Sequence, residues 1–420
     1  MARGAAELTQ TRKVMIKEQL ANLTALIDLR IADTPCNGLD DDMPMQPAID
    51  NTITHELAKE TYALLHAIKG PSLSVFNFGE QVMHVSAVRA LFGLGVFSAL
   101  PQDRQAMTAT ALAEKLGCDE ELLVRLMRMC TIWGPFKEVG TETYSHTQFS
   151  LAYLDPQVTN QFQAFVDEFL PACLQLHKFL EINNGKPPVD ATNCPYTLAH
   201  QTSGKDMWEH LAQFPKRSKV VNSAMYAISS AHPWPVALYP FREALLQLPP
   251  TSSNAPLVID IGGGQGQAIS VIRKMCGGIN GRFILEDRPE VLAGIPHTLR
   301  GIEKIECDLF KPQPVKGAAI YFLRHVLHDW AEDACVRILQ NIASAITDKS
   351  TQRVVISEMV LPEKGVTAEC ATQDLVTLST TGAERSRKQW ERLIPAAGFR
   401  VENIYSSEAS CEAAIECYLE

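Results

Sequence analysis

Pro256-Leu-Val-Ile-Asp-Ile-Gly-Gly-Gly-Gln-Gly-Gln267 is the stretch that decides the fold of this 420-residue chain. Apolar residues run straight into glycines at 262, 263, 264 and 266, and a helical pattern follows. This order predicts a buried strand, a tight turn and the first turn of a helix. Because glycine has no Cβ, such a turn lets a ligand approach the backbone closely.

The spacing within this turn indicates which ligand it suits. It reads Asp260-x-Gly262-x-Gly264-x-Gly266, whereas the fingerprint of dinucleotide-binding proteins is G-x-G-x-x-G. A carboxylate two residues before the first glycine attracts an ammonium group and repels a pyrophosphate. The turn therefore favours a ligand with a positive amino-acid end, such as S-adenosyl-L-methionine, over NAD.

The composition is that of a globular protein and argues against several other classes. Hydrophobic residues make up 46% and charged residues 20%, and the length suffices for two or three domains. The net charge of −10 argues against nucleic-acid binding, and no segment has the roughly 20 apolar residues that span a bilayer. The eleven cysteines lack metal-ligand spacing, which predicts reduced thiols, no metal site and a cytoplasmic location.

The first 75 residues are expected to form helices and a linker. Residues 11–30 and 51–69 carry apolar residues near helical spacing, and Pro71 then breaks the chain. Residues 33–50 are polar and contain prolines, so they are expected to form a flexible connector.

Residues 76–157 have the order of a winged helix, which consists of three helices and a small hairpin. Thr108 and Asp119 are expected to cap its second and third helices. A winged helix of this kind binds DNA through the third helix in some proteins. Here that helix presents an apolar face on which only Arg125 and Arg128 are basic, so we expect a dimerisation and lid module instead.

The rest of the chain divides at about residue 250. Residues 158–250 are expected to be helical, and their aromatic side chains, singly typical of a core, are together placed to wall an apolar substrate pocket. Residues 251–420 alternate strand and helix patterns, which predicts a Rossmann-like, doubly wound α/β sheet. The last run, 411–419, follows the sixth strand without an intervening helix, so the two strands are expected to form a hairpin. An antiparallel last strand is typical of the methyltransferase variant of this fold.

Two acidic strand ends are candidates for contacts with a nucleoside. Asp287 ends the second strand, 21 residues after the last glycine of the turn, and Arg288 follows it. An acid at this position accepts hydrogen bonds from both ribose hydroxyls, which NAD and S-adenosylmethionine share; the alternative is a solvated strand end. Asp308 is expected to end the third strand, with its carboxylate near the adenine amino group and Leu309 or Phe310 against the ring.

The fourth strand leads into Tyr321-Phe-Leu-Arg-His-Val-Leu-His-Asp-Trp330, which holds two candidate bases. A phenol or enol with a pKa of about 10 is little ionised at neutral pH, whereas a histidine with a pKa of about 6.5 accepts its proton. His325 and His328 are expected to point to opposite faces, because side chains alternate along a strand. His328 lies at the carboxyl end, where open sheets bind ligands, so it is the predicted base and His325 a buried, hydrogen-bonded residue.

A catalytic imidazole also needs a partner that orients its second nitrogen. Glu358 ends a strand pattern at the same carboxyl edge, and Glu384 lies in a loop before the helical pattern RSRKQW. The alternative for Glu384 is a capping or surface acid.

Together these motifs resemble the S-adenosylmethionine-dependent small-molecule O-methyltransferases, the plant caffeic acid and flavonoid enzymes and their fungal secondary-metabolite relatives. The resemblance runs from the winged helix to the C-terminus, and its motifs are the glycine turn 260–266, Asp287, Asp308, Arg324, His328-Asp329-Trp330, Ser357-Glu358 and Gly382-Ala-Glu384-Arg385.

The resemblance implies a homodimer with His328 as general base. Glu358 and Glu384 would flank this histidine, one orienting it and the other helping to fix the acceptor. Trp330 would pack against adenine. Arg324 would contact the cofactor through its stem or backbone, or pair through its guanidinium with the third-strand aspartate.

Three functions are consistent with the sequence. The first is methyl transfer to a phenol or enol hydroxyl of a small aromatic or polyketide-like molecule. The second keeps the fold and the cofactor without transfer, as in fungal relatives that catalyse dehydration or pericyclic ring closure; the presence of His328, Glu358 and Glu384 favours methylation over it. The third, a winged-helix regulator that senses a ligand, is disfavoured by the acidic charge. The expected partners are a small-molecule acceptor and a second copy of the chain, without nucleic acid or membrane.

Overall fold

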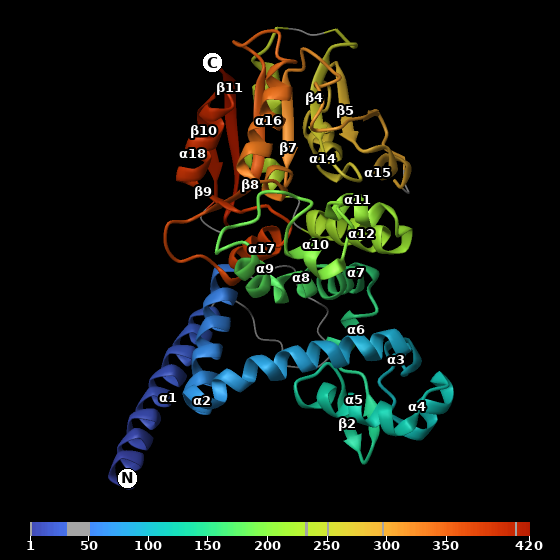
Figure 1. The fold of residues 1–420 in the computed structure, drawn as a ribbon, viewed down its shortest axis with the longest axis vertical. Coiled ribbons are helices and arrows are strands. Elements are labelled where there is room, and N and C mark those ends of the chain that lie inside the picture. Colours follow the sequence, from blue (N-terminus) through green and yellow to red (C-terminus); the bar gives the residue numbers. More distant parts are fainter. Residues whose placement is uncertain (1, 32–50, 232–233, 250–251, 296–297, 408–409) are drawn as a thin grey trace. The chain divides into compact units, whose positions relative to one another are not determined.

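The computed structural model describes residues 2–31, 51–231, 234–249, 252–295, 298–407 and 410–420 (Figure 1). The chain divides into two compact units, Met1–Thr159 and Asn160–Glu420. The connector expected at 33–50 falls outside the described residues. Within the described part of the chain, every helix is too short or too polar to traverse a bilayer.

The first unit begins with two long helices that pack against each other, α1 (Ala2–Ile31) and α2 (Asn51–Leu94). Arg12 of α1 ties the pair together, because its Nε donates a hydrogen bond to the carbonyl oxygen of Ala67 at 2.9 Å. Gly70 interrupts α2 with a φ of 72° and a ψ of 169°, immediately before Pro71. The predicted break is therefore present, although the glycine rather than the proline adopts the non-helical conformation.

A small winged-helix arrangement completes the first unit, with a three-stranded sheet in the order β1-β3-β2. Its elements are α3 (Val96–Ala99), β1 (Met107–Thr108), α4 (Ala109–Leu116), α5 (Glu120–Ile132), β2 (Lys137–Gly140), β3 (Thr143–Ser145) and α6 (Gln148–Ala152). The side chains of Thr108 and Asp119 cap α4 and α5 as predicted, by accepting hydrogen bonds from Ala111 N and Leu122 N. The apolar face of α5 buries Met127 completely, so packing accounts for its composition.

A run of short helices precedes the sheet of the second unit. They are α7 (Pro156–Ala164), a π-helical turn (Phe165–Phe169), α8 (Leu170–Leu174), α9 (Leu176–Ile182), α10 (Pro195–His200), α11 (Met207–Ala212), α12 (Pro215–Ala231), a 3-10 turn (Trp234–Leu238) and α13 (Phe241–Leu246). The buried carboxylate of Glu168 joins three of these elements, because it pairs with Arg217 at 2.7 Å and accepts a hydrogen bond from the Tyr196 hydroxyl at 2.9 Å. Among the aromatic residues of this region, Phe169 and Trp208 pack against its core.

An α/β sheet forms the rest of the second unit, in the order β10-β11-β8-β7-β4-β5-β6, with the short β9 paired to β8. Its strands are β4 (Pro256–Ile261), β5 (Arg282–Asp287), β6 (Ile302–Glu306), β7 (Ile320–Arg324), β8 (Arg353–Leu361), β9 (Arg385–Ser386), β10 (Phe399–Ser406) and β11 (Glu412–Leu419). β11 pairs antiparallel with β10 and with β8, whereas β4 to β8 pair in parallel. The predicted fold class, including its antiparallel last strand, is confirmed.

Five helices lie between these strands in the chain: α14 (Gln267–Met275), α15 (Pro289–Ala293), α16 (Glu332–Ala343), α17 (Ala368–Leu378) and α18 (Arg387–Ala396). α14 packs against β4 and β5, and α18 against β10 and α16, whereas α17 lies beside α8 of the preceding run of helices (Figure 1). Tyr321 and Phe322 are neighbours on β7 but belong to two different buried clusters, one around Trp390 and the other around Ile269. This alternation buries both faces of the strand. The candidate polar groups Asp260, Asp287 and Arg324 lie at the carboxyl ends of β4, β5 and β7.

Two strands end earlier than the sequence pattern suggested. β6 ends at Glu306, so Asp308 lies in the following loop, where its carbonyl oxygen accepts a turn hydrogen bond from Lys311 N at 3.0 Å. β7 ends at Arg324, so His325 already lies outside the strand. Asp308 and His325 therefore lie in loops, where the alternation of side chains along a strand does not apply.

Candidate functional site

The glycine turn joins β4 to α14 at the carboxyl edge of the sheet. Gly262, Gly264 and Gly266 all have positive φ values, of 67°, 60° and 81°. The N–H of Gly264 donates a hydrogen bond to Asp287 Oδ2 at 2.8 Å, and a Cβ on Gly266 would lie 2.8 Å from a leucine side chain. Because L side chains rarely adopt such φ values, the turn needs glycine and presents backbone to a ligand.

Asp260 is completely buried near the end of β4, where burial raises its pKa to about 7. Its Oδ2 accepts a hydrogen bond from Ile269 N at 3.1 Å, whereas its Oδ1 has no hydrogen-bond partner among the described residues. A buried carboxylate oxygen without a partner is costly, so this position suits a ligand group that is cationic or donates hydrogen bonds. The ammonium end of S-adenosylmethionine has that chemistry.

Asp287 ends β5 as predicted and holds the glycine turn. Besides the bond from Gly264, its Oδ1 accepts a hydrogen bond from Arg288 N at 2.7 Å. A carboxylate offers about four acceptor sites, so ribose hydroxyls can still donate to it. The Arg288 guanidinium lies over the Trp208 ring at 5.4 Å, which brings α11 beside this nucleoside position.

The loop after β6 carries the residues predicted to meet adenine. Asp308 is 48% exposed and pairs with Lys311 at 3.4 Å. Leu309 packs against the buried core, whereas the Phe310 ring stands edge-on to the Trp330 ring with centroids 4.8 Å apart. Phe310 remains 38% exposed, so an aromatic surface is available beside Trp330 for stacking.

Arg324 lies between the glycine turn and the histidine motif. Burial lowers the pKa of Arg324, although the carboxylates of Glu412, Asp260 and Glu358 act in the opposite direction. The buried charge of Arg324 is therefore stabilised by acids of the glycine turn and of the histidine cluster.

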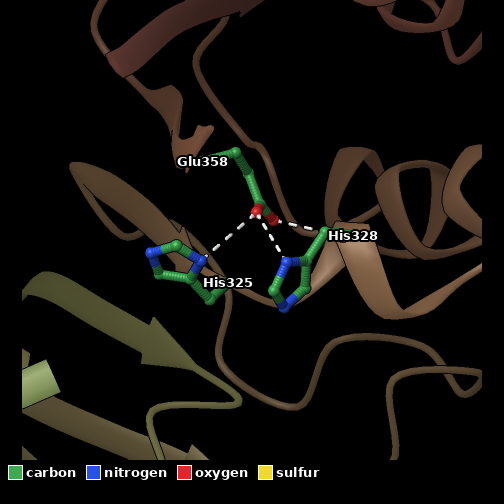
Figure 2. A group of neighbouring side chains, drawn as sticks. All are labelled: His325, His328 and Glu358. Carbon is green, nitrogen blue, oxygen red and sulfur yellow. Dashed lines mark hydrogen bonds and ion pairs between the residues drawn. The ribbon is translucent and has the colours of Figure 1, made fainter. Parts of the chain in front are cut away.

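His328 lies in a 3-10 turn directly after β7 and is 5% exposed. Its Nδ1 is 2.7 Å from Glu384 Oε1 and 3.8 Å from Glu358 Oε2, whereas its Nε2 is 3.5 Å from Asp329 Oδ1. Figure 2 shows the Glu358 carboxyl group between the rings of His325 and His328. Because a carboxylate can only accept, Glu384 favours the tautomer with its proton on Nδ1 and a lone pair on Nε2.

Glu358 also holds the backbone of this turn. Its Oε1 accepts hydrogen bonds from the N–H groups of Val326, Leu327 and His328 at 3.0, 2.9 and 3.3 Å. The side chain is completely buried, so water does not replace these bonds. The two predicted glutamates therefore contact different parts of the histidine, Glu384 the ring and Glu358 chiefly the main chain.

The prediction that His325 and His328 point to opposite faces is wrong. β7 has already ended at Arg324, and His325 has a φ of 51°, so strand alternation no longer applies. The two ring centroids lie 5.1 Å apart. His325 Nε2 lies 3.1 Å from Glu412 Oε1, which agrees with a hydrogen-bonded role, although its side chain is 23% exposed rather than buried.

The electrostatic field at His328 is strongly negative. Burial lowers the pKa of His328, but the carboxylates of Glu358, Asp329 and Glu384 outweigh burial and raise it to about 10. Burial also raises the pKa of Asp329 to about 6. In the protein alone the imidazole is therefore protonated at neutral pH, and a positive charge bound beside it would favour the neutral form.

A metal ion is the alternative explanation for this cluster. His325, His328 and Glu358 each offer one ligand atom, and the three atoms lie within 4.8 Å of one another. However, Glu384 already engages His328 Nδ1, and three amides already engage Glu358 Oε1. These hydrogen bonds account for the arrangement, which is that of an acid–base site.

Two carboxylates of the cluster were not among the candidate residues. Asp329 follows His328 in the quoted motif, and that adjacency was the available signal. No signal in the sequence indicated Glu412, because its place at the site depends on β11 pairing with β8, where Glu412 lies opposite Met359.

Comparisons with known proteins agree with this geometry. The family of O-methyltransferase domains matches residues 188–400, and the family of O-methyltransferase dimerisation domains matches residues 79–156. O-methyltransferase kntB of Aspergillus niger is 39% identical over 365 residues, which cover 87% of this chain and 88% of that protein. The crystal structure of OxaC with SAH and oxaline is 32% identical, with a TM-score of 0.87 over 97% of this chain and 100% of that one. A protein described as a pericyclic reaction enzyme is 26% identical, with a TM-score of 0.77 over 96% and 100%.

Proposed function

Because this chain belongs to the S-adenosylmethionine-dependent O-methyltransferase family, we propose that it methylates a phenol or enol hydroxyl of a small aromatic or polyketide-like metabolite, with His328 as general base. The observation that carries this proposal is the 2.7 Å contact between His328 Nδ1 and Glu384, which leaves Nε2 as the basic nitrogen. Bound S-adenosylmethionine supplies the activated methyl group and a positive charge.

The residues of the chain perform the acid–base part of this reaction. Glu384 retains the Nδ1 proton and orients the ring, while His328 Nε2 removes the hydroxyl proton of the acceptor. Asp329, 3.5 Å from Nε2, stabilises the imidazolium that forms. A positioned base contributes about 10²–10⁴-fold, and holding the reactants in line contributes the larger share, through effective molarities of about 10⁵ M or more.

The proposed cofactor contacts come from residues at the same carboxyl edge of the sheet. Asp260 takes the ammonium group, the glycine turn takes the amino-acid backbone, and Asp287 takes the ribose hydroxyls. The remaining contacts would surround the adenine and the sulfonium end, and they come from Arg288, Asp308, Leu309, Arg324 and Trp330.

Methyl transfer is tested directly by following the cofactor. Purified protein with S-adenosylmethionine and a panel of phenols and enols should release one S-adenosylhomocysteine for each methylated product. Methyl-labelled cofactor shows whether the label appears in the product. An acceptor that is converted while all label stays on the cofactor contradicts methyl transfer.

Similarity to a pericyclic reaction enzyme supports a second candidate, in which the bound sulfonium is only a fixed charge during dehydration or ring closure. The complete set of His328, Glu358 and Glu384 favours methyl transfer over ring closure, because ring closure needs no general base for a hydroxyl group. The labelling experiment separates the two candidates.

We infer that the working form is a homodimer. The match to a dimerisation domain supports this, and so do large apolar side chains in the part of α2 that follows the break: Val75, Phe76, Phe78 and Met83 are 62–69% exposed. Phe78→Glu should shift the sedimentation mass to one chain, because it places a charge in this apolar surface. A single-chain mass for the unaltered protein would contradict the inference.

The charge of His328 predicts a preference for S-adenosylmethionine that depends on pH. The raised pKa keeps the imidazole positive at pH 7, where it repels a sulfonium but not the neutral thioether of S-adenosylhomocysteine. As pH rises toward 10 the proton is lost, so the Kd for S-adenosylmethionine should fall relative to that for S-adenosylhomocysteine. Titration of Asp260 cancels in this ratio, because both ligands carry the same ammonium group.

Calorimetric titrations of both ligands from about pH 7 to pH 9 measure this ratio. His328→Gln should give a ratio that does not change with pH, since it removes the titrating ring. A flat ratio in the unaltered protein would show that the imidazole is neutral already at pH 7.

A further inference from the structure

The loop that carries Glu384 also contacts the main chain of the turn that carries His328. We propose that Gly382 and Arg385, which flank this glutamate, are positioning residues that hold His328 at the depth and angle needed for proton removal. This inference rests on the proposed function, because it assigns how the proposed base is placed. Both residues lie against the main chain of the turn, Gly382 at the carbonyl group of His328 and Arg385 at those of Leu327 and Trp330.

Gly382 packs closely against the carbonyl group of His328. A Cβ built on Gly382 would fall 1.9 Å from His328 O and 2.9 Å from its carbonyl carbon, which is well inside contact distance. The next residue, Ala383, donates a hydrogen bond from its N–H to the same oxygen at 2.9 Å. Glycine is needed at 382 because any side chain would push the histidine backbone away, not because of its φ.

Arg385 spans the turn through two hydrogen bonds. Its Nη1 donates a hydrogen bond to Leu327 O at 2.9 Å, and its Nη2 donates to Trp330 O at 2.7 Å. The guanidinium also lies over the Trp390 ring at 5.3 Å, and the residue is 4% exposed. Only a rigid, planar fork can reach the carbonyl groups on both sides of His328 and Asp329 at once.

The loop itself is fixed to the scaffold. Gly382 N donates to Thr377 O at 2.8 Å, and Glu384 N donates to Asp374 Oδ1 at 3.0 Å, so both ends of the contact are anchored on α17. Four consecutive residues therefore fix the position of His328. Gly382 and Ala383 contact its carbonyl oxygen, and Glu384 contacts its ring. Arg385 binds the carbonyl groups of the flanking residues Leu327 and Trp330. A displacement of about 1 Å at such a site costs about 10²-fold in rate.

Two substitutions test this assignment, each with a matched control. Gly382→Ala is compared with Gly277→Ala, whose Cβ would meet only ordinary contacts at 3.5 Å. Arg385→Lys is compared with Arg353→Lys, a buried arginine that pairs with Glu416 at 3.0 Å near the opposite end of β8. Both test variants should lose about 10²-fold in kcat with little change in the Kd for S-adenosylmethionine. Gly277→Ala should leave stability and kcat nearly unchanged, and Arg353→Lys should lose stability without a comparable loss in kcat.

Chemical rescue distinguishes a positioning role of Arg385 from a purely structural one. Guanidinium at millimolar concentration should restore part of kcat in Arg385→Ala, because it refills the fork site, but nothing in His328→Ala. If Arg385→Ala does not fold, Gly382→Ala and Arg385→Lys decide the question. The inference is wrong if both of those variants fold and turn over at nearly the unaltered rate while His328→Ala is inactive. If His328→Ala itself keeps its rate, the proposed function fails first.

Discussion

His328→Ala should turn over about 10²–10⁴-fold more slowly than the unaltered protein, because this is the contribution of a positioned general base. Cofactor binding should not weaken, since removal of the imidazolium leaves the nearby carboxylates to attract the sulfonium. Single-turnover rates with a fixed acceptor, combined with the calorimetric Kd for S-adenosylmethionine, measure both quantities. A loss in rate with intact binding would locate the defect in the chemical step.

His325→Gln is the matched comparison for this experiment. Its ring lies 5.1 Å from that of His328, and glutamine can keep a hydrogen bond to Glu412. We expect it to retain most of the rate, because His325 is not the ring oriented by Glu384. If the two variants exchanged these results, His325 would be the base and the assignment of His328 would be wrong.

Glu358→Ala should unfold at a clearly lower temperature and lose most activity. The substitution removes the acceptor of three buried amides, and each unsatisfied group costs about 1–3 kcal/mol. A total of at least about 3 kcal/mol corresponds to a decrease in Tm of about 6–12 °C for a domain of this size. Thermal unfolding followed by circular dichroism measures this loss.

Glu358→Gln separates the two roles of this side chain. Its amide oxygen can still accept from the turn, so most of the stability should return, whereas the negative charge near His328 is lost. The pKa of His328 should then fall, because the charge of Glu358 is one of the causes that raise it. An alanine variant that melts like the unaltered protein would show that the turn does not depend on Glu358.

The sequence patterns predicted the sheet well because its signals are local. β4 and the glycine turn follow from apolar residues that run into glycines, and β8 follows from the apolar run Val354-Val-Ile356 and the polar pair after it. The caps at Thr108 and Asp119 follow from residue type and position. The shifted ends of β6 and β7 could not be predicted, since turn hydrogen bonds and a left-handed residue decide them rather than hydrophobicity.

The sequence patterns predicted the candidate site only in part. Chemistry and resemblance selected His328, Glu358 and Glu384, and the structure brings these three side chains together. The reach of Arg385 across the turn has no pattern in the sequence, because it depends on how two distant loops meet. Likewise, the approach of Glu412 depends on strand order, which a single sequence does not specify.

The position of β11 has a consequence for how the protein is made. This strand follows every other strand that the structure describes, yet it lies between β10 and β8. A ribosome synthesising the chain exposes the hydrogen-bonding edge of β8 until β11 arrives, and an open edge is a template for aggregation. Glu412 reaches His325 only when that edge closes, so the nascent enzyme gains its complete charge cluster and its protection from misassembly in the same late step.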